Sequence, residues 1–178
     1  MTSKINMENM QSEAKTVVIG IGNAILSDDS VGIKAMHALR SAKEKEFHGV
    51  EFIEVSSGGI NLMEYMAGFN KAIIIDAIVT GKHKAGTVFK FIYPDIPYTR
   101  NTVSTHDMDL PMALEMGKYL GIALPPTIII FAIEAEDTVT FGEKLTEEVE
   151  ISLGIVVDEI KLLLAKRTDT HGCVKGML

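Results

Sequence analysis

Near the middle of the chain lies the run Ala72-Ile-Ile-Ile-Asp-Ala-Ile78, which has no polar face. Short β-branched runs bounded by turn residues predict buried strands. A strand that is apolar on both faces is typical of the middle of a parallel sheet, where helices cover both sides. The run therefore predicts a central strand between two helical layers.

The segments on either side of this run alternate between strand and helix patterns. Upstream, Thr16-Val-Val-Ile-Gly-Ile21 predicts a strand, and the amphipathic spacing after Val31 predicts a helix. The closing helix begins near Glu147, and its acidic first turn and basic end suit the helix dipole. The other predicted elements are strands over 50–55, 87–92 and 127–133, and helices over 60–68 and 108–119, while the helix after Val31 extends to Lys45.

The link between the third and fourth predicted strands is short. Residues 81–86 offer too few positions for a parallel crossover, so we expect an antiparallel hairpin between 72–78 and 87–92. This antiparallel pair makes the predicted sheet mixed, and the repeated strand–helix units make most of it parallel.

Composition restricts the classes of function. The chain has 178 residues, the size of one domain, and 17 Lys plus Arg against 24 Asp plus Glu give a net charge of −7. This acidic balance excludes a basic phosphate-binding surface, so we expect no nucleic-acid partner. The lone Cys173 excludes an internal disulfide and fits a reducing compartment.

The chain shows neither a signal peptide nor an apolar run of about 18 residues, the length that would span a bilayer. We therefore expect a cytoplasmic protein with no membrane partner. Its predicted organisation is a polar N-terminal tail over 1–15, one domain over 16–166 and a C-terminal tail over 167–178.

The loop after the first strand carries the first candidate site. Gly20-Ile-Gly22 begins like a dinucleotide-binding fingerprint, but Ile25 stands where the third glycine would be. Asp28 and Asp29 place negative charge at a helix N-terminus, where a pyrophosphate would need N–H groups. The loop therefore favours a cation, although Asp28 could equally be a helix cap and Asp29 a first-turn acid.

Two further residues could complete a cation site. Asp76 lies inside the apolar central strand, where a carboxylate is costly unless it is paired, hydrogen-bonded or bound to metal. His106 precedes a predicted helix, and alone it is more simply an exposed loop residue. Two carboxylates and an imidazole from separate loops suit Ni, Zn, Mn or Fe(II). Serine or cysteine nucleophile motifs and phosphate-cradling lysine loops are missing from the sequence.

Several motifs occur together in one order, namely Gly20-Ile-Gly-Asn23, Leu26-Ser-Asp-Asp29, Gly32, Gly58-Gly59, Ile75-Asp76-Ala77 and Ser104-Thr-His106. In this combination the chain resembles the hydrogenase maturation endopeptidases, the processing proteases of [NiFe] hydrogenase large subunits. The resemblance runs from about Lys15 to Lys166.

The resemblance implies a three-layer α/β/α sandwich around a twisted, mixed, mostly parallel five-stranded sheet. It implies an endopeptidase that removes the C-terminal extension of a large-subunit precursor after nickel insertion. The family's metal-contacting acids and histidine fall on Asp29, Asp76 and His106, which would recognise nickel supplied by the precursor. No organic cofactor is implied.

The resemblance also places residues around the substrate. The residues expected to border the cleft are Asn23, Asp28, Gly58, Gly59 and Glu136. The sequence departs from the family pattern at Ser30, Ser57, Ala132 and Ala135. Two other functions stay open from the residues alone. One is a nickel-binding chaperone that cleaves nothing, and the other is a nucleotide-binding or small-molecule enzyme that uses the Gly20–Gly22 loop.

Overall fold

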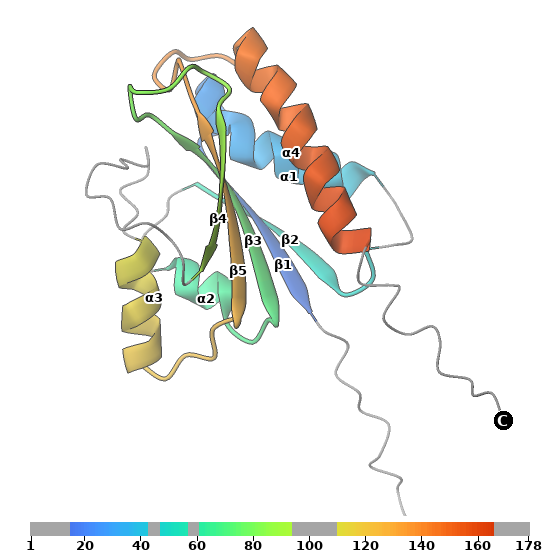
Figure 1. Ribbon diagram of the computed structural model, residues 1–178, viewed down its shortest axis with the longest axis vertical. Coiled ribbons are helices and arrows are strands. Elements are labelled where there is room, and N and C mark those ends of the chain that lie inside the picture. The colour runs from blue at the N-terminus through green and yellow to red at the C-terminus, as the bar shows by residue number, and fades with distance from the viewer. Residues whose placement is uncertain (1–14, 43–46, 57–60, 94–109, 166–178) are drawn as a thin grey trace, which may run out of the picture.

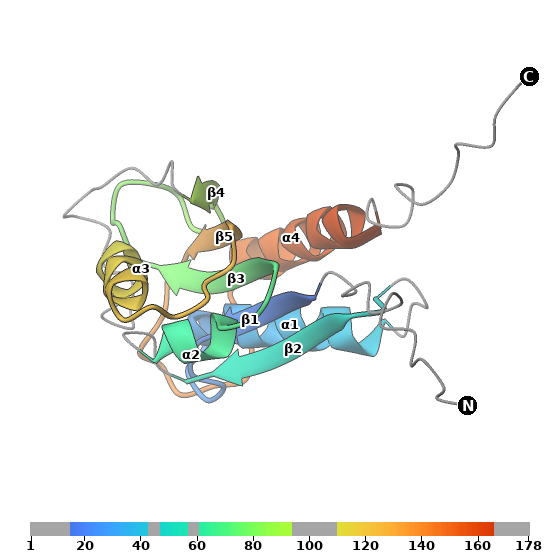
Figure 2. The same cartoon turned by 90° about the horizontal axis from the view of Figure 1, so that it is seen from below.

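A computed structural model describes residues 15–42, 47–56, 61–93 and 110–165 of the chain. They form a five-stranded sheet of β1 (Thr16–Ile21), β2 (Val50–Val55), β3 (Lys71–Ile78), β4 (Val88–Tyr93) and β5 (Thr127–Glu134) in the order β2-β1-β3-β5-β4. Four strands are parallel, and β4 alone is antiparallel to its neighbour. Figure 2 shows β2 and β4 at opposite edges, so β3 is the central strand that the sequence predicts.

Helices cover both faces of the sheet, as Figure 1 shows. The helices are α1 (Val31–Ser41) and α4 (Glu147–Ala165) on one face, and α2 (Leu62–Met66) and α3 (Leu110–Tyr119) on the other. Alternate residues of each central strand enter two separate cores. In β3, Ile73 and Ile75 pack with α1 and α4, whereas Ala72 and Ile74 pack with α2 and α3. The predicted three-layer α/β/α sandwich is confirmed.

The predicted hairpin between the third and fourth strands is wrong, because β4 pairs with β5 and not with β3. The direction of β4 is nevertheless antiparallel to both. The loop over 79–87 is long enough to cross two strand spacings, about 10 Å. The run Ile128–Ile133 is apolar on both faces, and it is more deeply buried between β3 and β4 than at the edge.

Glycines at the contact allow helix α1 to pack closely against the sheet. A Cβ on Gly32 would stand 2.3 Å from the carbonyl oxygens of Ile21 and Ile75. A Cβ on Gly20 would stand 2.3 Å from the carbonyl oxygen of Gly32. The start of α1 is therefore fixed against the carboxyl ends of β1 and β3.

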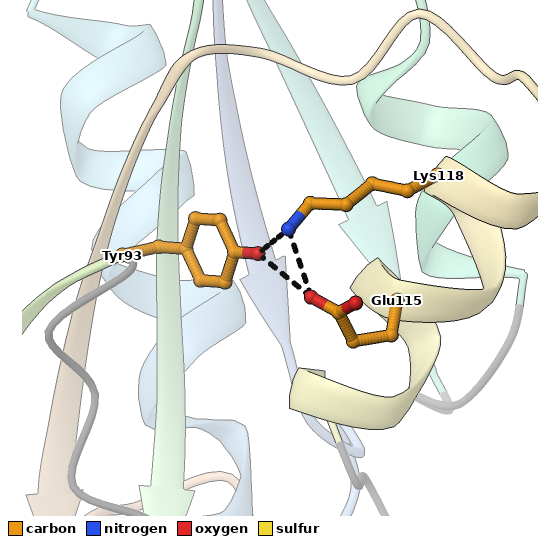
Figure 3. Close-up of polar contacts among 3 residues, drawn as sticks. All are labelled: Tyr93, Glu115 and Lys118. Atoms are coloured by element: carbon orange, nitrogen blue, oxygen red, sulfur yellow. Dashed lines mark hydrogen bonds and ion pairs between the residues drawn. The ribbon is translucent and has the colours of Figure 1, made fainter.

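On the opposite face, α3 is joined to the edge strand β4 by a polar cluster, shown in Figure 3. Lys118 donates to the hydroxyl oxygen of Tyr93 and to Oε1 of Glu115, which is 2.8 Å away. The Lys118 ammonium also lies 4.9 Å from the centre of the Tyr93 ring. The cluster connects Tyr93, at the end of β4, with the second half of α3.

Most predicted bounds agree with the structure within about two residues, and α1 ends at Ser41 instead of Lys45. Of the helices that the structure describes, none combines the length and apolar character needed to cross a bilayer.

Candidate functional site

The two predicted metal-binding carboxylates both lie toward the carboxyl ends of the parallel strands. Asp29 belongs to a 3₁₀ turn, η2 (Asp28–Ser30), which follows β1 and packs against β3. Asp76 lies in β3, beside β1, and the alternation of that strand directs its side chain to the face of α2 and α3. Both residues are almost fully buried, at 3% and 4% exposure. The structure therefore brings both acids to one end of the sheet, at adjacent strands.

The turn that carries Asp29 is held by its own carboxylate. Asp29 Oδ2 accepts the backbone N–H of Asn23 at 2.9 Å. Asn23 Oδ1 in turn accepts the N–H of Ile25 at 3.2 Å. Gly22 has a φ of 152°, and a Cβ there would lie 2.0 Å from the carbonyl oxygen of Asp29. Only glycine allows the chain to fold back this tightly over the acid.

Asp76 accepts a hydrogen bond from its own strand. Its Oδ1 accepts the N–H of Ala77, the next residue, at 2.9 Å. A carboxylate is costly to bury unless it is paired or hydrogen-bonded, and this bond offsets part of the cost of placing Asp76 in the central strand.

Asp28 is part of a buried network that links distant segments. Its Oδ2 accepts the N–H groups of Glu136 and Asp137, each at 3.0 Å, and its Oδ1 accepts that of Thr146 at 2.7 Å. The Thr146 hydroxyl lies within hydrogen-bond distance of both oxygens. The interpretation of Asp28 as a cap of α1 is wrong, because Ser30 occupies that position without a side-chain cap bond. Asp28 instead joins the Asp29 turn to the loop before α4.

The other residues expected at the cleft are distributed as follows. Asn23 is half-buried beside Asp29, and Glu136 is exposed, with its backbone bound to Asp28. His106 and the pair Gly58–Gly59 lie outside the described residues. Within the ranges that the structure describes, no group of three His, Cys, Asp or Glu side chains could hold a metal ion.

Glu134 is a buried acid that the sequence reasoning missed. It ends β5 beside β3, and it is only 2% exposed. Its Oε1 accepts the N–H groups of Thr80 and Gly81, and its Oε2 accepts the Thr80 hydroxyl. Glu134 therefore holds the loop after β3 and is satisfied without a metal. Its sequence signal is the one that identified Asp76, an acid within an apolar strand.

Asp137, in the loop after β5, has a lowered pKa. The hydroxyl and N–H of Thr140, followed by the N–H of Val139, donate to Asp137 and hold the pKa of its carboxyl below the usual value. Asp137 therefore stays anionic beside the network of Asp28.

Comparisons with known proteins identify the family of the chain. A family model described as hydrogenase maturation protease matches residues 33–163. The hydrogenase 2 maturation protease of Escherichia coli (strain K12) is 30% identical over 111 residues, 60% of this chain and 65% of that protein. The hydrogenase expression/formation protein HoxM of Azotobacter vinelandii is 24% identical over 140 residues, 77% of this chain and 66% of that protein. The matches thus span slightly less than two thirds of these two relatives.

Solved structures show the same fold. The hydrogenase maturating endopeptidase HybD of E. coli superimposes with a TM-score of 0.68 at 23% identity, covering 86% of this chain and 93% of that one. The [NiFe] hydrogenase maturation protease HybD of Thermococcus kodakarensis gives a TM-score of 0.62 at 24% identity, covering 84% and 99%.

Proposed function

The chain belongs to the hydrogenase maturation protease family, and from this membership we propose that it is an endopeptidase that trims a [NiFe] hydrogenase large-subunit precursor. The bond cleaved is the one that releases the C-terminal extension once nickel has been inserted. The observation that carries the proposal is the pair of buried acids, Asp29 and Asp76, at the carboxyl ends of adjacent strands.

We propose that the nickel in the precursor is the element recognised. Asp29 and Asp76 would each supply a carboxylate oxygen to it, and His106 an imidazole nitrogen. Carboxylate and imidazole are ligands that suit a divalent ion of this hardness. Because the ion arrives with the precursor, binding it also positions the precursor's tail.

The chemistry would follow from this placement. A divalent ion polarises a neighbouring carbonyl and lowers the pKa of a bound water, and a carboxylate within reach takes the proton from that water. The protonated carboxyl can then give the proton to the leaving amine. In this proposal Asp29 and Asp76 carry out the transfer, because they are buried acids at the carboxyl ends of adjacent strands. Asp28 and Glu134 hold loops in place through the hydrogen bonds that they accept.

The structure disfavours the nucleotide-binding alternative. In a dinucleotide fold, N–H groups of the glycine-rich loop bind the pyrophosphate. Here the N–H of Asn23 donates to the Asp29 carboxylate, and that of Gly22 donates to the carbonyl of Val55 at 3.1 Å. The loop thus presents an anion where a phosphate would have to bind.

The proposal is tested by incubating the purified protein with the large-subunit precursor of its source organism and measuring the precursor's mass. The wild type should shorten it. Asp76→Asn should lower the rate at least about a hundredfold, because the amide keeps the bond from Ala77 but loses the charge. Glu51→Gln removes an exposed carboxylate on β2 and should leave the rate unchanged. A protein that binds nickel and precursor but never shortens it would be a chaperone, which is the other candidate.

A further inference from the structure

Three large apolar side chains are exposed on two neighbouring loops. Ile25 lies in the loop after β1, and Val139 and Phe141 lie in the loop between β5 and α4. Their exposed fractions are 57%, 79% and 79%. We call these three residues the apolar platform. Isolated exposed apolar residues need no explanation, but three on adjoining loops indicate a surface that is used.

The two loops are bound to each other through their backbones. The N–H of Gly142 donates to the carbonyl of Ile25 at 3.0 Å, and the N–H of Ser27 donates to that of Thr140 at 3.1 Å. Leu26 and Phe141 form an antiparallel β-bridge. The backbone beneath the platform is therefore held in place, so little conformational entropy is lost when a partner binds.

The β5–α4 loop is also fixed internally. Asp137 Oδ1 accepts the N–H groups of Val139 and Thr140, at 3.1 and 2.9 Å. The buried Asp28 carboxylate holds the N–H of Asp137 from below. The exposure of Val139 and Phe141 is therefore not the result of a loosely held loop.

The platform adjoins the candidate site along the chain. Ile25 lies between Asn23, whose N–H binds Asp29, and the turn η2 that contains Asp29. On the other loop, Glu136 and Asp137 bind Asp28, the residue before Asp29. Both loops of the platform are thus attached to the turn that presents Asp29, which places the platform at the rim of the site.

The charges around the platform indicate the chemistry of its occupant. Between residues 136 and 144 the chain carries Glu136, Asp137 and Glu143 against Lys144 alone. Such a surface attracts a segment with basic side chains and repels a second copy of itself, which would bring the same acids together. The net charge of −7 acts in the same direction.

We propose that the apolar platform docks the large-subunit precursor, through a segment of apolar side chains flanked by basic ones, next to the bond that is cut. This inference rests on the proposed function. Docking energy supplied away from the reacting atoms lowers KM and leaves kcat unchanged when it stabilises the bound substrate and the transition state equally.

The test is the rate of cleavage of nickel-loaded precursor as a function of its concentration. Phe141→Ser should raise KM about tenfold with kcat unchanged, because truncation of an aromatic anchor at an interface has an effect of this size. Val139→Ser should act in the same direction more weakly, and added salt should raise the KM of the wild type. As a matched control, Ile151→Ser on α4, where the side chain is 60% exposed, should change neither constant.

The outcomes separate the two proposals. If the wild type cleaves and Phe141→Ser keeps the wild-type KM, the docking inference is overturned and the proposed function stands. If the wild type does not cleave, the proposed function fails. In that case the affinity of the protein for the precursor, measured by sedimentation of mixtures, tests the docking inference. Weaker binding by Phe141→Ser than by the wild type would support the inference, and equal affinity would overturn it. Loss of self-association in Phe141→Ser would show that the platform binds a second copy instead.

Discussion

Asp28 and Thr146 are 118 residues apart in the chain, and the Thr146 N–H donates to Asp28 Oδ1 at 2.7 Å. This contact joins the turn after β1 to the residue before α4. Because Asp29 follows Asp28 directly, the geometry of the candidate site depends on a loop from the other end of the domain.

Replacing Asp28 by Asn should destabilise the protein. The carboxylate accepts three backbone N–H groups, and an amide would direct its NH₂ at one or more of them. Hydrogen bonds to a buried charge contribute about 1.5–3 kcal/mol, so the free energy of unfolding should fall by about 2–3 kcal/mol. Urea denaturation measures this. A mild effect, as expected for a helix cap, would show that the network is unimportant. Glu136→Gln serves as the control because Glu136 binds through its backbone alone.

At Glu134 the same exchange should be tolerated. The amide oxygen of Gln can take the place of Oε1 and accept the N–H groups of Thr80 and Gly81, while its NH₂ donates to the Thr80 hydroxyl. Glu134→Ala, in contrast, leaves these donors unpaired and should cost about 1–3 kcal/mol. Thermal unfolding should therefore give a lower melting temperature for Glu134→Ala than for Glu134→Gln. Equal melting temperatures would contradict the role of Glu134 in holding the loop after β3.

Two glycine-to-alanine exchanges should act in opposite directions. In Gly32→Ala the new methyl group would meet two backbone carbonyls at 2.3 Å, so α1 must move and the free energy of unfolding should fall by about 1–3 kcal/mol. In Gly154→Ala, within α4, the new methyl group would meet nothing within 4 Å beyond the neighbouring backbone of its own helix, and the helix propensity of alanine should add about 1 kcal/mol. Chemical denaturation of both variants checks the pair, and a destabilised Gly154→Ala would be the contrary result.

The cluster in Figure 3 should contribute stability that depends on pH. The side-chain hydrogen bond from Lys118, followed by that from Tyr93, lowers the pKa of Glu115 from 4.5. Because the pKa of Glu115 is lower in the folded state, its ionised carboxylate contributes fully to the free energy of unfolding above pH 4.5. This contribution is lost as the pH falls through the lower pKa of the folded state. The difference in unfolding free energy between wild type and Glu115→Gln should therefore be constant near neutral pH and vanish in acid. A difference that grows in acid would contradict this.

The sequence predicted the layers of the fold well because they follow from local patterns. The runs at 16–21 and 72–78 are buried on both faces, which is typical of strands in a sheet that helices cover on both sides. The neighbour of β4 was not predictable in this way. The choice between β3 and β5 as its partner depends on two features. The 79–87 loop must be long enough to cross β5, and the strand that is apolar on both faces must be buried between two others and not at the edge of the sheet.

The burial of the acids at the candidate site could be predicted in part for a similar reason. Asp76 is visible as an acid in an apolar strand, and Glu134 shows the same signal at the end of its run. The role of Asp28 could not be predicted, because its partners lie 108 to 118 residues away. Local sequence suggests a cap at this position, and only the folded chain shows which donors reach the carboxylate.

The central claim is that nickel in the precursor controls cleavage through Asp29, Asp76 and His106. The most direct test is the mass of the precursor after incubation with the wild-type protein, in parallel nickel-loaded and nickel-free samples. The account predicts that only the nickel-loaded form is shortened. The two acids and the histidine bind the nickel, and this binding positions the precursor's tail for cleavage. Trimming of both forms at the same rate would contradict the account and remove the role given to these three residues.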